Sequence, residues 1–245
     1  MSGTMDKLTD GARKLGIELT LAQLQQFEQY YALLVEWNAR MNLTAILEYD
    51  KVQLLHFLDS LSVVLGLENR NLLEKPGLKV LDVGTGAGFP GIPMKIVFPA
   101  IDLCLNDATE KKSLFLAEVV RKLGLKSVQI AVGRAEELGQ MKQHRERFDL
   151  ILCRAVAEMA ALAELCLPFC CPGGRVIAQK KGGISDEMER ARRAVKEMGG
   201  APVKTVKVDL PELGDGRCLV VVEKVGKTPP QYPRRPGMPA NKPIL

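Results

Sequence analysis

The chain has 245 residues, 47% apolar and 26% charged, with a formal net charge of +5. This composition is typical of a globular protein with a sizeable core and excludes a chain that is disordered throughout. No apolar run approaches the roughly 20 residues that cross a bilayer, and the first twenty residues carry six charges where a signal peptide would be apolar. We therefore expect a soluble, cytoplasmic protein that does not bind membranes.

The charge is unevenly distributed along the chain. Residues 1–75 hold seven Lys/Arg and ten Asp/Glu, so the positive excess lies in the remainder. After Glu223 there is no acidic residue, whereas five Lys/Arg follow. A basic end without acids favours a polyanionic partner such as RNA, although charge alone fits a solubilising tail equally well.

Six cysteines lie in apolar stretches such as CLPFCC, with no CxxC pair and no histidine at metal-ligand spacing. This pattern is typical of reduced core residues in a cytosolic protein. We expect neither a disulfide framework nor a metal site.

Residues 1–75 are expected to form an N-terminal helical segment. Apolar residues recur at steps of three and four from Leu21 to Met41, which predicts an amphipathic helix over about residues 20–38. A second helical pattern follows over residues 52–65.

From residue 76 to residue 225, short apolar runs alternate with helical patterns. This alternation predicts an α/β domain with a mostly parallel sheet and helices on both faces. The last two runs have no helical pattern between them, so we expect an antiparallel end. Residues 226–245 contain six prolines and no periodicity, which predicts an extended, basic tail. The expected strands contain KVLDV, IDLCLN, SVQIAV, DLILC, RVIAQ, VKTVKVDL and CLVVVEKV.

The strongest functional signal is VLDVGTGAGFPGIP, residues 80–93. Glycines 84, 86, 88 and 91 allow tight turns and close approach to a ligand, and a helix is expected to begin near Pro90. The pattern predicts a nucleotide-cofactor loop at the carboxyl end of the first strand.

Two kinds of cofactor remain open on this loop. Gly86, Gly88 and Gly91 match the GxGxxG pattern of dinucleotide-binding dehydrogenases, with Asp107 about 20 residues downstream. Asp82, however, precedes the glycines, and a carboxylate there suits the ammonium of a methionine moiety better than the phosphates of a dinucleotide. The loop therefore favours S-adenosylmethionine.

Three further strand ends offer candidate ligand contacts. Asp107 can accept both ribose hydroxyls, or cap the following helix. Ala135 and Glu136 follow the third strand, where backbone groups commonly meet an adenine edge, although Glu136 also fits an ordinary acid in a first helical turn. Arg154 follows the fourth strand and can anchor a methionine carboxylate or an RNA phosphate, or form a surface salt bridge.

Taken together, these motifs resemble the 16S ribosomal RNA guanine-N7 methyltransferases of the small-subunit methyltransferase G family, also called glucose-inhibited division protein B. The resemblance covers nearly the whole chain. Cys153 and the pair Lys180 and Lys181 depart slightly from the family pattern without removing a cofactor contact. The matching stretches are WNARMNLTAI (37–46), HFLDSL (56–61), VLDVGTGAGFPGIPMKI (80–96), LNDATEKKSLFL (105–116), GRAEEL (133–138), FDLILCRA (148–155), AQKKGG (178–183) and YPRRPGMPANKPI (232–244).

The resemblance implies a class I methyltransferase fold, Rossmann-like, with a seven-stranded sheet preceded by helices. It also implies methyl transfer from S-adenosylmethionine to N7 of one guanine in 16S rRNA or the 30S subunit. That reaction needs no acid or base, so we expect positioning rather than acid–base catalysis, with Arg154 as the best candidate. We expect the chain to act as a monomer. The expected cofactor contacts are Asp82, Gly84, Gly86, Gly88, Phe89, Asp107, Ala135, Glu136 and Arg154.

We further expect Lys180, Lys181, Arg234 and Arg235 to bind the RNA backbone. The NLT block (residues 42–44) and the run from residue 56 to residue 61 fit substrate contact and simple helix packing equally well. The competing functions are a Rossmann-type dehydrogenase, a non-catalytic RNA-binding assembly factor and a small-molecule methyltransferase.

Overall fold

The computed structural model describes residues 4–154, 156–214 and 216–245. Residues 1–3 of the expected N-terminal segment and Ala155, the last residue of the FDLILCRA stretch, lie outside the described residues. Within these ranges, no helix combines the length and apolarity that a membrane crossing requires.

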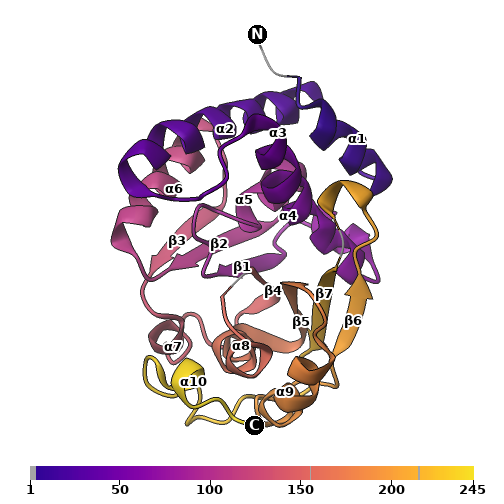
Figure 1. The fold of residues 1–245 in the computed structure, drawn as a ribbon. Coiled ribbons are helices and arrows are strands. Elements are labelled where there is room, and N and C mark those ends of the chain that lie inside the picture. Colours follow the sequence, from indigo (N-terminus) through magenta and orange to yellow (C-terminus); the bar gives the residue numbers. More distant parts are fainter. Residues whose placement is uncertain (1–3, 155, 215) are drawn as a thin grey trace.

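A seven-stranded sheet forms the centre of the molecule, in the order β3-β2-β1-β4-β5-β7-β6 (Figure 1). The pairs from β3 to β5 are parallel, whereas β7 lies antiparallel between β5 and β6. The expected class I methyltransferase architecture is therefore confirmed, including its antiparallel end. The strands are β1 Lys79–Val83, β2 Asp102–Asp107, β3 Val128–Val132, β4 Phe148–Arg154, β5 Cys170–Lys181, β6 Lys204–Lys207 and β7 Arg217–Glu223.

Helices cover both faces of this sheet, as expected. Figure 1 shows α1 to α6 above the sheet and α7 to α10 below it. Because successive strand residues point to opposite faces, neighbours divide between two hydrophobic clusters: Val80 packs above and Leu81 below. The helices are α1 Asp6–Lys14, α2 Leu21–Met41, α3 Tyr49–Val52, α4 Asp59–Leu61, α5 Gly91–Val97, α6 Glu110–Lys122, α7 Ala135–Leu138, α8 Met159–Cys166, α9 Ser185–Glu197 and α10 Met238–Asn241.

The N-terminal segment packs directly on the upper face. Phe27, Tyr30 and Phe57 are completely buried in the same cluster as the strand residues of that face. The expected helix over 20–38 is α2, which begins with a capping box formed by Thr20 and Gln23. Leu21, expected on the apolar stripe, is instead 80% exposed, because the buried face of α2 begins only at Phe27. The boundary near residue 75 thus separates two parts of one core.

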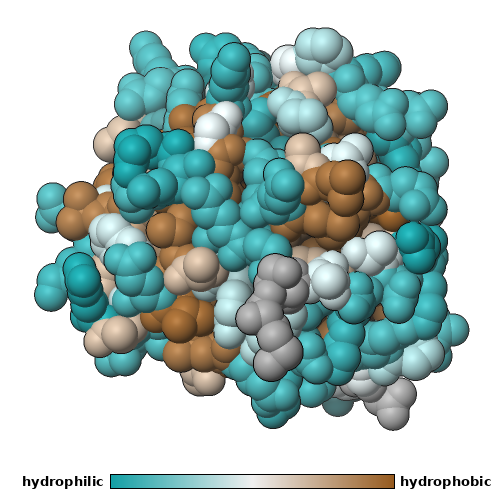
Figure 2. All heavy atoms as spheres, turned by 90° about the horizontal axis from the view of Figure 1, so that it is seen from above, coloured by the Kyte–Doolittle hydropathy of each residue, from teal (hydrophilic) through white to brown (hydrophobic). Residues whose placement is uncertain are grey.

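The second expected helix is irregular. It runs through α3, a π-helical stretch at Gln53–Leu58, α4 and a 3-10 stretch at Ser62–Gly66. π-helical turns are rare and often lie at functional sites. The irregular helix carries the HFLDSL run, in which His56 and Asp59 contact Arg154 at the carboxyl end of β4. Seen from above, the layer that includes these helices is mostly hydrophilic on its outside, with a few hydrophobic patches (Figure 2).

The C-terminal residues form a packed segment. They run beneath the sheet beside α7, α8 and α9 and include the short helix α10 (Figure 1). The expected tail is thus packed against the domain, because its backbone carbonyl groups accept the hydrogen bonds described below.

Candidate functional site

A glycine-rich loop connects the end of β1 to α5. Gly84, Gly86 and Gly88 have φ values of +67°, +59° and +96°, which strain any residue with a Cβ atom. At Gly91 a larger residue would clash with its neighbours, because an added Cβ would lie 2.7 Å from a Leu105 methyl group. The loop thus lies at the carboxyl end of a central strand, where open α/β sheets bind ligands.

Asp82 is completely buried beneath this loop. Its Oδ2 accepts hydrogen bonds from Thr85 Oγ1 at 2.6 Å and from Gly91 N at 2.8 Å. Its Oδ1 has no hydrogen-bond partner among the described residues. Burial raises the pKa of Asp82 to about 7, although the bonds from Thr85 and Gly91 oppose this rise. A buried carboxyl group with an unused acceptor fits the ammonium of a methionine moiety, or a water bound to it.

Asp107 closes the other side of the loop from the end of β2. Its Oδ2 accepts from Gly86 N at 3.0 Å and from Lys112 Nζ at 3.3 Å, while Oδ1 accepts from Thr109 N at 2.9 Å. Asp107 therefore fixes both the glycine loop and the start of α6. Its role as a ribose partner stays a prediction.

The turn after β3 places Ala135 and Glu136 at the same edge of the sheet. The side chain of Glu136 is largely buried, and its Oε1 accepts a hydrogen bond from Gly237 N at 2.8 Å. This carboxylate therefore contacts the C-terminal segment. The predicted backbone contact with a cofactor stays a prediction.

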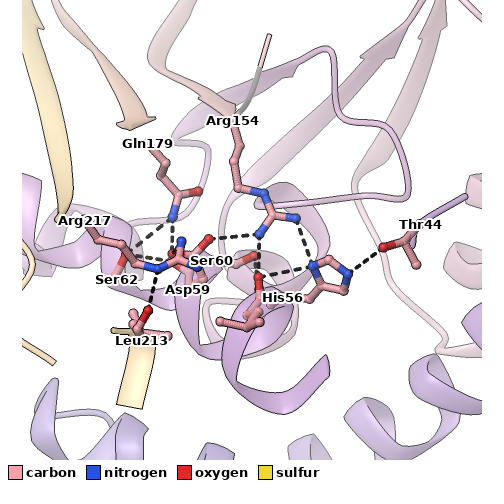
Figure 3. Close-up of polar contacts among 10 residues, drawn as sticks. Thr44, His56, Asp59, Ser60, Ser62, Arg154, Gln179, Leu213 and Arg217 are labelled. Carbon is pink, nitrogen blue, oxygen red and sulfur yellow. Dashed lines mark hydrogen bonds and ion pairs between the residues drawn. The ribbon is translucent and has the colours of Figure 1, made fainter. Parts of the chain in front are cut away.

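Arg154, at the end of β4, is held by the N-terminal segment (Figure 3). Its Nη1 donates to Asp59 Oδ2 at 3.0 Å and to the carbonyl oxygen of Leu55 at 3.1 Å. Arg217, at the start of β7, donates to Asp59 Oδ1 at 2.6 Å. One buried carboxylate thus serves two guanidinium groups, each about 17% exposed. Arg154 does form a salt bridge, but with a buried carboxylate and not at the surface as considered, and the surplus positive charge of the two arginines suits an anionic ligand.

His56 connects the NLT block to Arg154. Its Nε2 lies 2.9 Å from Thr44 Oγ1 and its Nδ1 lies 3.4 Å from Arg154 Nη2. The imidazole stacks on Phe89 at 4.6 Å between ring centroids, and the Arg154 guanidinium carbon lies 5.0 Å from the centroid of the same phenyl ring. Burial, followed by the nearby charge of Arg154, lowers the pKa of His56 to about 4, so the ring is neutral at pH 7.

The four basic residues predicted to bind RNA have different surroundings. Lys180 Nζ donates to Glu187 Oε1 and to the carbonyl oxygen of Ala157, both at 2.6 Å. Arg234 forms a bidentate pair with a buried carboxylate on α8. Lys181 and Arg235 are exposed. Lys180 and Arg234 therefore already have partners within the protein, and the prediction that all four side chains bind RNA stays a prediction.

The cysteines are thiols, and five of the six are buried. Burial raises the pKa of Cys104 to about 11 and that of Cys170 to about 12, so these thiols are protonated and unreactive at pH 7. Among the described residues, no three His, Cys, Asp or Glu side chains gather in a way that could hold a metal ion.

Sequence reasoning missed the acids that hold the basic residues in place. Asp59 lies in the apolar run LLHFLDSLS and Glu164 in the apolar helix α8, and both are almost completely buried. A single carboxylate within an apolar helical pattern is rarely buried without a cationic partner. That signal could have identified both residues. No comparable sequence pattern indicated a role for Arg217.

Comparison with known proteins places this geometry in a family. The family model described as rRNA small subunit methyltransferase G matches residues 23–213. A relative from Dehalococcoides mccartyi (strain CBDB1), named ribosomal RNA small subunit methyltransferase G, is 54% identical over 98% of this chain and 100% of its own length.

Two solved structures share the fold. An S-adenosylmethionine-dependent O-methyltransferase from Thermotoga maritima is 15% identical, with a TM-score of 0.52 over 80% of this chain and 72% of that one. Aeropyrum pernix fibrillarin, in complex with natively bound S-adenosyl-L-methionine, is 18% identical, with a TM-score of 0.51 over 66% of this chain and 72% of that one. The structural likeness supports the fold and the sequence match identifies the family: this chain belongs to the rRNA small subunit methyltransferase G family.

Proposed function

We propose that this chain transfers a methyl group from S-adenosylmethionine to N7 of one guanine in the 16S rRNA of the small ribosomal subunit. The observation that carries the proposal is the nearly full-length match to relatives named ribosomal RNA small subunit methyltransferase G. The glycine loop, with the unused acceptor of buried Asp82 beneath it, agrees with that match.

The residues at the carboxyl edge of the sheet fit the cofactor. Asp82 offers an acceptor for the ammonium group, and Gly84, Gly86 and Gly88 bring the backbone close. Phe89 is only 4% exposed and carries the stack of His56 and Arg154. We propose that Asp107 receives the ribose and that the backbone at residues 135 and 136 meets the adenine. When bound, S-adenosylmethionine supplies an electrophilic methyl group on a positively charged sulfur.

The protein contributes mainly by holding the guanine. N7 of guanine keeps a free lone pair, so no residue has to remove a proton before the transfer. Proximity and orientation contribute up to roughly 7 to 11 kcal/mol in favourable cases. Burial and the nearby charge of Arg154 keep His56 neutral at pH 7, so this imidazole adds no charge to the site. We propose Arg154 as the principal positioning side chain, because it is already oriented by Asp59 and Leu55.

For RNA binding, we propose Lys181 and Arg235 as contacts with the phosphate backbone. Both are exposed, and Lys181 ends β5 at the same edge of the sheet as Arg154. Neutralising an exposed phosphate contact weakens RNA binding and lowers its dependence on salt. An unchanged RNA affinity in the Lys181→Ala/Arg235→Ala variant would contradict this assignment.

Methyl transfer is tested with labelled S-adenosylmethionine and unmodified 30S subunits or 16S RNA. Label in RNA is the expected result. Label in no RNA, despite cofactor binding, would point to another acceptor, as would label in a small molecule. A thermal shift with a nicotinamide cofactor but none with S-adenosylmethionine would instead favour a dehydrogenase. Cofactor-independent effects on subunit assembly would favour the RNA-binding assembly factor.

We also propose that the chain works in the cytoplasm, where an rRNA substrate is made and assembled in bacteria. Action as a monomer and independence from metal ions stay predictions. Light scattering tests the first, and activity after dialysis against a chelator tests the second.

A further inference from the structure

The C-terminal residues dock on the end of α7 and on the residues that follow it. Gln140 Nε2 donates to the carbonyl oxygen of Pro233 at 2.8 Å, and Arg145 Nη1 bridges the carbonyl oxygens of Gly139, at 3.2 Å, and Tyr232, at 2.6 Å. The contact is also tight sterically, because a Cβ added at Gly139 would lie 3.0 Å from the Pro233 ring. The segment therefore holds the end of α7 from outside.

A buried ion pair anchors this segment to α8. Glu164 is completely buried, and its carboxylate accepts hydrogen bonds from the backbone N of Arg234 at 2.7 Å, from Nε at 2.9 Å and from Nη2 at 2.6 Å. The Arg234 Nη2 also donates to the carbonyl oxygen of Lys242 at 2.9 Å. Arg234 thus fixes the course of residues 232–242 on the domain, and Gly237 lies inside that stretch.

Gly237 carries the connection to the proposed cofactor site. Its N–H donates to Glu136 Oε1 at 2.8 Å, and Glu136 directly follows Ala135 in the turn proposed to meet the adenine. The helix α7 has only four residues, and a helix of one turn has too few internal hydrogen bonds to hold its own shape. Its shape therefore depends on external anchors, and the C-terminal segment supplies three: at Glu136 within the helix, and at Gly139 and Gln140 directly after it.

We propose that residues 232–242 form a strap that positions Ala135 and Glu136, at the start of α7, for the adenosine part of the cofactor, with Arg234 and Glu136 as positioning residues. This proposal rests on the proposed placement of the cofactor at that turn. In the strap, Arg234 has a different role from the exposed Arg235 beside it. Arg234 shapes the cofactor site from behind, while Arg235 faces solvent.

The test compares Glu136→Ala with Glu136→Gln by titration calorimetry with S-adenosylmethionine. Glutamine keeps an oxygen that accepts from Gly237 N–H, whereas alanine does not. We expect the dissociation constant to rise at least about tenfold in Glu136→Ala and to stay within about twofold in Glu136→Gln, since apparent affinity falls with the fraction of molecules whose turn keeps the binding shape. In steady state, Glu136→Ala should raise KM for the cofactor and leave kcat and KM for RNA unchanged.

Arg234→Ala and Arg235→Ala form the matched second pair. They remove the same charge from adjacent residues, but only the first breaks the anchor on Glu164. We expect weaker cofactor binding in Arg234→Ala, partly restored in Arg234→Lys, and normal cofactor binding in Arg235→Ala.

Cofactor affinity that is unchanged in both Glu136→Ala and Arg234→Ala would overturn the strap. An equal loss in Glu136→Gln and Glu136→Ala would also overturn it, since the carboxylate itself would then contact the cofactor. A wild-type chain that binds cofactor but methylates no RNA would refute the proposed substrate and leave the strap intact.

Discussion

The buried carboxyl group of Asp82 should make the cofactor-free protein less stable as the pH rises. Burial raises its pKa from an ordinary value of 3.8 to about 7, so the folded chain binds this proton more tightly than the unfolded chain does. Its contribution to the free energy of unfolding is therefore full below about pH 4, is lost between about pH 4 and pH 7, and stays lost above. A shift of roughly three pKa units corresponds to about 4 kcal/mol in total.

Replacing Asp82 by asparagine removes this titration while keeping the shape of the side chain. Urea unfolding of the variant and the wild type should show that the variant gains roughly 2 to 3 kcal/mol relative to the wild type between pH 5 and pH 8. Asp209→Asn serves as the control, because the Asp209 side chain is 87% exposed. Its free energy of unfolding should stay within about 0.5 kcal/mol of the wild-type value at both pH 5 and pH 8. The reasoning would be refuted if the free energy of unfolding of Asp82→Asn, relative to that of the wild type, stayed constant or fell between pH 5 and pH 8.

Three further outcomes follow from named contacts. Asp59→Asn should lower the free energy of unfolding by about 3 to 5 kcal/mol in urea, because two mostly buried guanidinium groups lose the carboxylate that they share; a loss below about 1 kcal/mol would contradict this. Gly91→Ala should cost about 1 to 3 kcal/mol by overpacking, whereas Gly183→Ala, with nothing within 4 Å of its added Cβ, should be nearly neutral in the same assay. In filter-binding titrations, Lys181→Ala should lower the slope of the logarithm of RNA affinity against the logarithm of salt concentration by about the amount that one phosphate contact contributes. Lys180→Ala, which breaks an internal ion pair, should leave this slope unchanged.

The sheet could be predicted from the sequence because its strands are short, continuous apolar runs between helical patterns. The run around Leu81 is buried on both faces, and a continuous apolar run of this kind indicates a strand of a sheet that helices cover on both sides. The glycine loop was predictable for a related reason: Gly84, Gly86 and Gly88 adopt backbone shapes that only glycine enters easily.

Long-range pairing could not be predicted in the same way. Arg234 meets Glu164 across 70 residues, and Arg154 meets Asp59 across 95, so no local spacing indicates either pair. Charge alone fitted RNA binding and a solubilising tail equally well, and neither interpretation predicted that Arg234 pairs with Glu164 inside the protein. The irregular helix over residues 49–66 was also hidden, because π and 3-10 stretches interrupt the regular spacing on which helix prediction depends.

The most direct test of the account is nucleotide mapping after methyl transfer. Purified protein is incubated with labelled S-adenosylmethionine and unmodified 30S subunits or 16S RNA, and the modified position is identified by mass spectrometry of nuclease fragments. The account predicts a single new N7-methylguanine, lost in Arg154→Ala and in a Gly84 substitution. Methylation at a different atom or at many positions, or undiminished transfer by both variants, would contradict it.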